Sequence, residues 1–534
     1  MGSFLLFRYG EVYSKQDSLL KDINLLFKIF KLDQIYSMHS NYKKLLKFTN
    51  KIADIKNAIA ILNWDQETYM PPKGQGFRAQ QIATLSGIAH ETATSTAYET
   101  CINELLDEPS LSPVESKNIQ LLKQDMVKAK KLPSDFVIGL SKATSKAFHA
   151  WIAARKANDF KLFEHALSEM VKIQQEKAEI YGYKNHIYNA LMDDYEPKAT
   201  VQEIDTLFNE VKTKLSPLLT QIAKSPQVED AFMYKHFGKD KQWDFGMSIL
   251  EQLGYDLEAG RQDLAEHPFS TTFSPLDVRV TTRVNEKNFY DMLWSCIHEC
   301  GHALYEQGLS ADHYGMPCGE AVSLGMHESQ SRFYENNIGR SKAFWEFNYP
   351  AVKAKFPNQF EGITSDNFYR AANIVKPSLI RTDADELTYH FHIMIRYEIE
   401  KQIIEGSLAV SDVKDAWNEA YSKYLNIIVP SDNQGVLQDV HWSHGGFGYF
   451  PTYSLGSFYA AQFEAKMVKD IPDMFQEIRT GEFSNILTWL RTNIHQHGRF
   501  YTSQELCKNA TGETLKFDYF MDYALRKYSE IYAL

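Results

Sequence analysis

Residues 294–308 constrain the fold of this chain more than any other stretch, because they place metal-binding side chains on a predicted helix. They contain the pattern H-E-x-x-H as His298, Glu299 and His302. On an α-helix a spacing of four residues is about 400° of rotation, so both imidazoles project from one face with the carboxylate beside them. Apolar residues recur at helical spacing on another side, which indicates packing against a core. The stretch therefore predicts a metal site on a rigid, buried helix.

The composition favours a helical globular protein. Hydrophobic residues make up 44% of the 534 residues, and the chain has only 17 prolines and 27 glycines, which leaves little sequence for linkers or for closely spaced strands and turns. The net charge of −11 provides no basic surface for nucleic acid, and no apolar run approaches the roughly 20 residues that cross a bilayer. We therefore expect a soluble, mainly α protein that binds neither nucleic acid nor membranes.

The five cysteines indicate a reducing compartment. They are odd in number, and most are far apart in a chain that is too large to need disulfides for stability. We therefore expect a cytoplasmic protein. Cys296 and Cys300 lie one helical turn apart, and a thiolate pair is one interpretation of them. Because they point away from the face of His298 and His302, buried thiols are the interpretation we favour.

Helical periodicity dominates the first half of the chain. Apolar residues recur every three or four positions, and prolines fall near the breaks, which predicts long antiparallel helices. The predicted helices cover residues 42–62, 78–106, 116–157, 160–181, 201–223 and 243–253.

Residues 276–281 give the first clear strand signal. Leu276, Val278 and Val280 alternate with polar residues, so one face is apolar and the other is polar. A strand just before the metal helix can form a cleft wall and present backbone groups to an extended peptide. The alternative is a partly buried hairpin in which Arg279 forms a salt bridge.

A third metal ligand is expected from the next predicted helix, residues 319–334. A catalytic zinc usually takes three protein ligands and keeps a fourth position for water, so a carboxylate from a second helix would complete the set. Glu328 is our choice, and its competitors are Glu320, His327 and Glu335. Spacing alone does not separate these four residues.

Three further segments follow the metal helix. Residues 387–404 are amphipathic and predict a long helix, and residues 457–534 predict a closing helical bundle. Between them, residues 435–456 are rich in glycine and aromatic residues, which is typical of irregular backbone. A lone His441 or Tyr449 in such a segment is more often structural than catalytic.

Six motifs of this chain, in order, resemble those of the M32 family of metallocarboxypeptidases, the carboxypeptidase Taq type. The resemblance also includes residues 64–71 and extends from about Tyr42 to the C-terminus, so residues 1–37 lie outside it. The six motifs are H-P-F (267–269), D-x-R-x-T (277–281), H-E-C-G-H (298–302), H-E-S-Q (327–330), I-R-x-x-A-D (380–385) and G-x-x-Q-D-x-H-W (435–442).

The resemblance implies a mainly α, elongated, gluzincin-like fold with a deep central groove and a small β element beside the H-E-x-x-H helix. It implies one catalytic domain over residues 38–534, often a homodimer, after an N-terminal extension (1–37) of unknown role. It also implies that Glu328, the acid of H-E-S-Q, is the third ligand. The implied activity is the removal of single residues from the free C-termini of peptides, and His267 joins the substrate-binding residues.

The expected chemistry is hydrolysis at zinc, with cobalt as the alternative metal. Glu299 takes the proton of the activated water, and the metal polarises the scissile carbonyl. His441, Tyr449 or Tyr453 can stabilise the oxyanion. The sequence also leaves two rival functions open, a zinc endo-oligopeptidase and a catalytically silent peptide-binding homologue.

An exopeptidase must also recognise a terminal carboxylate. A guanidinium is the suited group because it binds a carboxylate through two hydrogen bonds. Arg381 and Arg279 are the two candidates. We expect Asp383 or Asp385 to orient Arg381, since both lie in the same motif.

Overall fold

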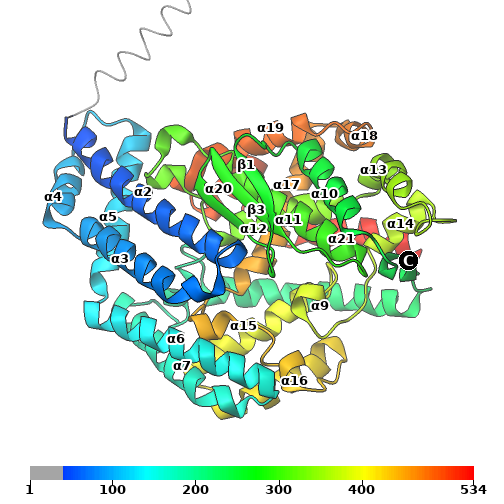
Figure 1. Cartoon of the computed structure of the whole chain (residues 1–534), viewed down its shortest axis with the longest axis horizontal. Helices are drawn as coiled ribbons and strands as arrows, with labels where there is room; N and C mark the ends of the chain where they lie inside the picture. Colours follow the sequence, from blue (N-terminus) through cyan, green and yellow to red (C-terminus); the bar gives the residue numbers. More distant parts are fainter. Residues whose placement is uncertain (1–39) are drawn as a thin grey trace, which may run out of the picture.

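The computed structural model describes residues 40–534 and is mainly helical, with one small sheet (Figure 1). The first half of the described chain contains α2 (Ser40–Thr68), α3 (Gln75–Ala93), α4 (Thr96–Leu105), α5 (Pro113–Lys131), α6 (Ser134–Ala157), α7 (Lys161–Tyr181), α8 (Asn189–Met192), α9 (Val201–Lys224) and α10 (Lys239–Leu253). The second half contains α11 (Phe289–Glu306), α12 (Leu324–Arg332), α13 (Lys342–Lys355), α14 (Ser365–Ala372), α15 (Tyr389–Glu405), α16 (Val413–Leu425), α17 (Pro451–Asp470), α18 (Met474–Arg479), α19 (Ser484–Asn493), α20 (Ser503–Thr511) and α21 (Asp518–Tyr532).

Two predicted helices are each divided in the structure. The expected helix over residues 78–106 is α3 followed by α4, because Ser95 adopts an extended conformation and caps α4 by accepting a hydrogen bond from the Tyr98 amide. The expected helix over residues 116–157 is α5 followed by α6. Leu132 is extended there, as a residue before a proline prefers to be, and Pro133 starts the next helix. Local capping therefore overrides the continuous apolar periodicity.

The sheet has three strands in the order β1 (Gly260–Leu264), β3 (Asp277–Thr282) and β2 (Ser270–Ser274). The predicted strand is β3, which pairs parallel to β1 and antiparallel to β2. Both backbone edges of β3 are therefore occupied, and the expectation that this strand presents its backbone to a peptide is wrong. The flanking strands have weak sequence signals, so their pairing could not be predicted.

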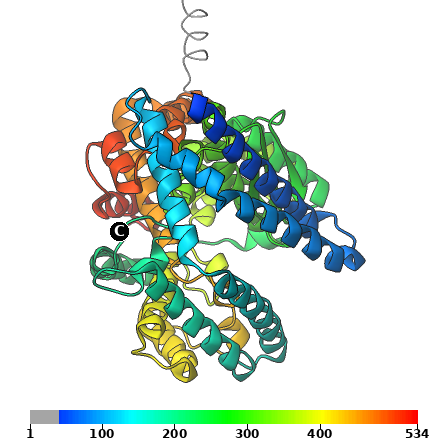
Figure 2. The ribbon, with the colours of Figure 1, turned by 90° about the vertical axis from the view of Figure 1, so that its left-hand side faces the viewer.

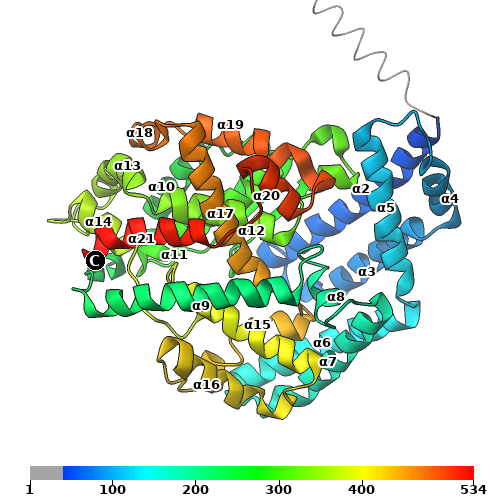
Figure 3. The ribbon, with the colours of Figure 1, turned by 180° about the vertical axis from the view of Figure 1, so that it is seen from behind.

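The helices bury two hydrophobic clusters. The larger one extends from α6 to α21 and contains the apolar face of α11, as the sequence predicted. The smaller one joins α2, α4 and α5 and also includes Met316, from the segment after α11. Figure 2 shows α2 and α3 side by side on one flank, and α2 also packs against β2. On the opposite face α9 lies between α15 and α21 (Figure 3).

Two glycines allow α12 to pack very closely between α11 and α17. A Cβ atom at Gly301 would lie 2.5 Å from the backbone oxygen of Gln330 on α12. A Cβ atom at Gly456 on α17 would lie 2.5 Å from Cγ of Glu328. Because neither position tolerates a side chain, α12 sits directly against both neighbours. This packing fixes Glu328 beside the face of α11 that carries His298 and His302.

The segment over residues 435–456 is irregular only as far as Phe450. It includes the short turn His441–His444, and then Pro451 occupies the first turn of α17, where its missing amide hydrogen costs nothing. Tyr453 and Gly456 are therefore helical residues, contrary to the prediction. After α12, the residues Phe333–Gly339 form a π-helix, which the periodicity of residues 319–334 did not reveal.

Candidate active site

Three side chains from α11 and α12 form a metal-binding set. The Oε2 atom of Glu328 lies 3.7 Å from Nε2 of His298 and 3.5 Å from Nε2 of His302. One ligand atom from each of the three residues lies within 4.8 Å of the others. Two imidazole nitrogens and one carboxylate oxygen are the donor set of many catalytic zinc sites. The residues present therefore fit a zinc ion.

The second nitrogen of each imidazole is occupied, which turns Nε2 toward Glu328. Nδ1 of His298 lies 2.8 Å from Oε2 of Glu335. Nδ1 of His302 lies 2.6 Å from Nδ1 of His327 and 3.1 Å from its backbone oxygen. His327 Nε2 in turn lies 2.8 Å from Oε1 of Glu306, so His327 donates to Glu306 and accepts from His302. Such partners fix the tautomer of a metal-binding histidine.

The structure separates the four candidates for the third ligand. Among residues 40–534, only Glu328 joins both imidazoles in a possible metal-binding group. Glu335 and His327 contact the Nδ1 atoms and so lie behind the imidazoles. Glu320 is instead paired with Arg499, 2.9 Å away. The geometry therefore gathers the residues that the family resemblance implied.

Glu299 lies next to this set and is 7% exposed. Burial raises the pKa of its carboxyl group to about 7, and the charge of Glu328 acts in the same direction. The hydroxyl of Ser270 on β2 forms a hydrogen bond with Glu299 and opposes this shift. The strand before the metal helix thus contacts the carboxylate that the H-E-x-x-H pattern supplies.

Arg381 is buried and is held on two sides. Its Nε donates to Oδ1 of Asp439 over 3.0 Å, and its Nη1 donates to the hydroxyl of Tyr389 over 3.2 Å. The guanidinium carbon lies 4.8 Å from the ring centre of Tyr453. Within the described chain, Nη2 has no hydrogen-bond partner. The Nη2 amino group of a fixed guanidinium thus stays available to a ligand.

The expectation that Asp383 or Asp385 orients Arg381 is wrong. Asp385 accepts hydrogen bonds from the backbone amides of Leu387 and Thr388, so it caps the following turn. Asp439, in the G-x-x-Q-D-x-H-W motif, takes this role instead. The sequence signal was present, since the two motifs were both recognised, but their contact across 58 positions was not predictable.

Arg279 and His267 lie in different surroundings from Arg381. Arg279 donates from Nε and Nη2 to the two oxygens of Asp277, both over 2.9 Å. Its guanidinium carbon is 4.7 Å from the ring centre of Trp64 and 4.9 Å from that of Phe273. His267 is exposed in the loop between β1 and β2. Arg279 is therefore paired with both oxygens of Asp277, whereas Arg381 shares the carboxylate of Asp439 with Arg396.

The three predicted oxyanion-stabilising residues lie together. Nε2 of His441 is 3.1 Å from the hydroxyl of Tyr453, and the rings of Tyr449 and Tyr453 are 5.1 Å apart. Burial lowers the pKa of His441 to about 3, so the imidazole is neutral near pH 7. Burial, together with the charge of Glu328, raises the pKa of Tyr449 to about 12. Both tyrosines thus keep their hydroxyl protons and lie within the field of Glu328.

Sequence reasoning missed Arg332, which connects the metal ligands to the Arg381 region. Its Nε donates to Oε1 of Glu328 over 2.7 Å, and its Nη1 donates to Oε2 of Glu335 over 3.3 Å. Its guanidinium carbon lies 4.4 Å from the ring centre of Tyr389, which itself bonds Arg381. The spacings of four and three residues from the two acids were the available signal.

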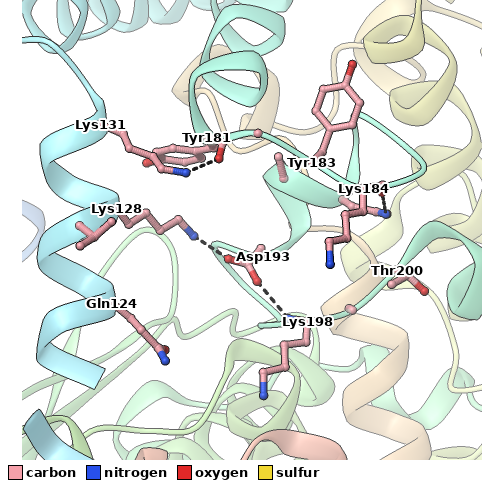
Figure 4. Close-up of a pocket in the computed structure, with 14 residues that line it drawn as sticks. Gln124, Lys128, Lys131, Tyr181, Tyr183, Lys184, Asp193, Lys198 and Thr200 are labelled. Carbon is pink, nitrogen blue, oxygen red and sulfur yellow. Dashed lines mark hydrogen bonds and ion pairs between the residues drawn. The ribbon is translucent and has the colours of Figure 1, made fainter. Parts of the chain in front are cut away.

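A separate pocket of about 480 Å³ opens between α5, α7 and the start of α9 (Figure 4). Lys128 points into it and donates to Oδ2 of Asp193 over 2.8 Å, and the Lys198 amide donates to the other oxygen of Asp193. None of the predicted metal, base or substrate residues lines this pocket. Lys128 is already paired with Asp193, so we assign this pocket no part in the chemistry.

Comparisons with known proteins agree with this geometry. The family model described as carboxypeptidase Taq (M32) metallopeptidase matches residues 44–528. Carboxypeptidase 1 of Bacillus subtilis is 41% identical over 93% of this chain and 100% of its own length. Thermostable carboxypeptidase 1 of Thermus thermophilus is 37% identical over 92% of this chain and 99% of its own length.

The solved structures give the same picture. The crystal structure of the M32 carboxypeptidase from Deinococcus radiodurans R1 superposes with a TM-score of 0.91 at 37% identity. The match covers 93% of this chain and all of that one.

Among residues 40–534, no helix is long and apolar enough to cross a membrane.

Proposed function

Because this chain belongs to the carboxypeptidase Taq (M32) metallopeptidase family and is therefore a metallocarboxypeptidase, we propose that it uses zinc as its metal and Glu299 as its general base. The observation that carries the proposal is the convergence of one ligand atom each from His298, His302 and Glu328 within 4.8 Å. Cobalt fits the same nitrogen and oxygen donors and is the second choice of metal.

In the proposed hydrolysis, the metal, the general base and the aromatic residues each have one role. When bound, zinc supplies a Lewis acid that polarises the scissile carbonyl and acidifies water. Glu299, buried on α11 beside His298 and His302, accepts the proton of the water and passes it to the leaving amine. The hydroxyl groups of Tyr449 and Tyr453 donate hydrogen bonds toward the developing oxyanion, and His441 orients Tyr453 through its Nε2 atom.

We assign the recognition of the substrate's C-terminus to Arg381. A terminal carboxylate loses its water when it enters a buried site, and a guanidinium offsets that loss by charge and hydrogen bonding. Arg381 suits this role because Asp439 and Tyr389 fix it while Nη2 stays free. The terminal carboxylate that Arg381 would bind is present on every peptide with a free C-terminus. Recognition through Arg381 therefore supports broad specificity for the C-terminal side chain of the substrate. Arg279, whose Nε and Nη2 pair with both oxygens of Asp277, is the weaker candidate.

The remaining expectations extend this proposal to the whole protein. We propose that residues 38–534 act as one catalytic domain and that the chain forms a homodimer in the cytoplasm. Residues 1–37 lie outside the described residues, so their role stays a prediction. Light scattering on the purified chain tests the dimer.

One assay separates the proposed function from its rivals. A peptide with a free C-terminus and its C-terminal amide are incubated with the enzyme, with and without a chelator, and the products are identified by mass spectrometry. We expect stepwise loss of single residues from the free acid only, and no loss in the chelator. Cleavage of the amide at internal bonds would favour the endo-oligopeptidase. Absence of any cleavage with full metal occupancy would favour a silent binding protein.

A further inference from the structure

The π-helix that follows α12 brings together two residues that an α-helix would separate. Its hydrogen bonds join residues five apart, so such residues lie on the same side, whereas on an α-helix they differ by about 140°. Glu335 lies within the π-helix Phe333–Gly339, and Arg340 follows it five positions after Glu335. Nη2 of Arg340 donates to Oε1 of Glu335 over 2.9 Å. The irregular turn therefore creates this ion pair.

The carboxylate of Glu335 accepts hydrogen bonds from three side chains. Besides Arg340, its carboxylate receives Nη1 of Arg332 at 3.3 Å and Nδ1 of His298 at 2.8 Å. The residue is 7% exposed, so these partners replace the water that a carboxylate would otherwise bind. Of these three residues, only His298 is a proposed metal ligand.

The π-helix itself is anchored from two neighbouring helices. The backbone oxygen of Asn336 accepts hydrogen bonds from the hydroxyl of Tyr523 at 2.9 Å and from Nζ of Lys527 at 3.3 Å, both on α21. The side chain of Asn337 donates to Oε2 of Glu464 on α17 over 2.5 Å. Contacts at the two residues that follow Glu335 therefore hold the turn in its unusual form. π-helical turns occur frequently at functional sites.

We propose that Glu335 is a positioning residue of the metal site, and that the π-helix serves to lock its carboxylate behind His298 through Arg340. By accepting the Nδ1 hydrogen of His298, Glu335 keeps the ring in one tautomer and one orientation, with Nε2 toward Glu328. A carboxylate in this place also makes the imidazole a stronger donor to a metal. The inference rests on the proposed metal site.

A purely structural role for Glu335 is the alternative. In that role the carboxylate only neutralises Arg332 and Arg340, and its loss would weaken the fold without changing the metal site. Glu464 offers a matched control, because it is a buried carboxylate on α17 that binds Asn337 of the same π-helix and also binds Arg526. Glu464 contacts none of the proposed ligands.

The test compares Zn²⁺ affinity in wild type, Glu335→Gln and Glu464→Gln, each as the full chain, by competition with a chromophoric chelator. Removing an outer partner of a metal-binding histidine typically lowers metal affinity about 10- to 100-fold, and we expect this for Glu335→Gln. The visible spectrum of the Co²⁺-loaded protein should shift in the same variant. In Glu464→Gln the amide oxygen can still accept the hydrogen bond of Asn337, so the anchor of the π-helix remains and only the charge opposite Arg526 is lost. This variant should lower the melting temperature and leave both metal readouts at the wild-type value.

Two outcomes would overturn the inference. In the first, Glu335→Gln folds and keeps the Zn²⁺ affinity and the Co²⁺ spectrum of the wild type. In the second, Glu464→Gln loses as much Zn²⁺ affinity as Glu335→Gln does. If Glu335→Gln does not fold, Arg340→Lys serves instead, with an expected smaller fall in Zn²⁺ affinity; unchanged affinity in that variant counts against the proposal. A wild-type chain that binds no Zn²⁺ would contradict the proposed metal site itself, so the two failures are distinct.

Discussion

Arg332 donates from Nε to Oε1 of Glu328 over 2.7 Å, and this contact decides which oxygen of the carboxylate faces the imidazoles. Oε2 is left to face the Nε2 atoms of His298 and His302. The hydroxyl of Ser331 also donates to Oε2, over 3.1 Å. A charge-assisted hydrogen bond of this kind is roughly twice as strong as a neutral one. Glu328 is therefore held ready to bind a metal through a single oxygen.

Replacing Glu328 with alanine should remove a ligand and release the metal. We expect the loss of affinity to exceed the roughly 10- to 100-fold typical of an outer partner, because a direct ligand is lost. Metal content after dialysis, measured by mass spectrometry of the elements, checks this. A Glu328→Ala chain that keeps full occupancy would assign the third ligand to another acid, with Glu335 the first to test.

Replacing Glu299 with glutamine should separate catalysis from metal binding. The amide keeps the size of the side chain and cannot accept the proton, so kcat should fall by about 10²- to 10⁴-fold. Metal content should stay at the wild-type level, because Glu299 is not among the three ligands. Loss of the metal together with activity would contradict the assignment of Glu299 as the base.

Glu400 should make the stability of the fold depend on pH. It is fully buried and accepts hydrogen bonds from Tyr188, Trp442 and the Gly448 amide, yet burial raises its pKa to about 7 from an ordinary value of 4.5. Because the folded state binds this proton more tightly than the unfolded state, the stability it contributes is complete below about pH 4.5 and is lost as the pH rises through 7.

The variant Glu400→Gln removes this proton equilibrium. Relative to the variant, the metal-free wild-type chain should therefore be more stable at pH 5 than at pH 8, by a difference of a few kcal/mol in the free energy of unfolding. Urea titrations of both chains at the two pH values measure it. A difference that stays constant between pH 5 and pH 8 would show that Glu400 does not change its protonation in this range.

The N-terminal extension should be dispensable. Residues 1–37 precede the family motifs, and Met38 offers an alternative start. A chain that begins at Met38 should therefore keep the melting temperature and the kcat/KM of the full chain. Thermal unfolding and the peptide assay check this together. A large drop in melting temperature would mean that the extension packs on the catalytic domain.

The sequence predicted the features of the fold that depend on local pattern. The metal helix and most long helices follow from apolar periodicity, and these predictions are confirmed by α11 and its neighbours. The strands β1 and β2 and the π-helix were not predicted. The two strands are short and polar, and they form because β3 offers them backbone partners. The π-helix depends on distant anchors such as Tyr523 and Lys527.

The residues of the candidate site also divide into those that the local sequence pattern predicts and those that depend on distant contacts. The spacing of His298 and His302 is local and could be read directly, whereas spacing alone left Glu328 among four residues. The role of Asp439 was missed, because a contact between positions 381 and 439 depends on how the helices pack. The charge of Asp439 is shared by Arg381 and Arg396, and only the folded chain reveals this arrangement.

Arg381→Ala tests whether this residue reads the terminal carboxylate. Losing one partner of a buried, hydrogen-bonded charge pair typically costs about 2–5 kcal/mol, so kcat/KM on free-acid peptides should fall at least roughly thirtyfold. On amidated peptides, which lack the charge, the fall should be much smaller. The fold should survive the change, because Asp439 keeps its hydrogen bond to Arg396 at 2.5 Å.

Two further variants decide whether the charge or the geometry of Arg381 matters. Arg381→Lys keeps the charge but loses the planar fork that Asp439 and Tyr389 hold in place, so it should recover only part of the activity. Arg279→Ala is the matched control, and its effect should not depend on whether the peptide ends in an acid or an amide, because Arg279 is paired with Asp277. If Arg279→Ala abolishes the preference for the free acid while Arg381→Ala retains it, the two roles are exchanged. If neither variant changes the preference, arginine does not read the carboxylate in this enzyme, and the endo-oligopeptidase becomes the better interpretation.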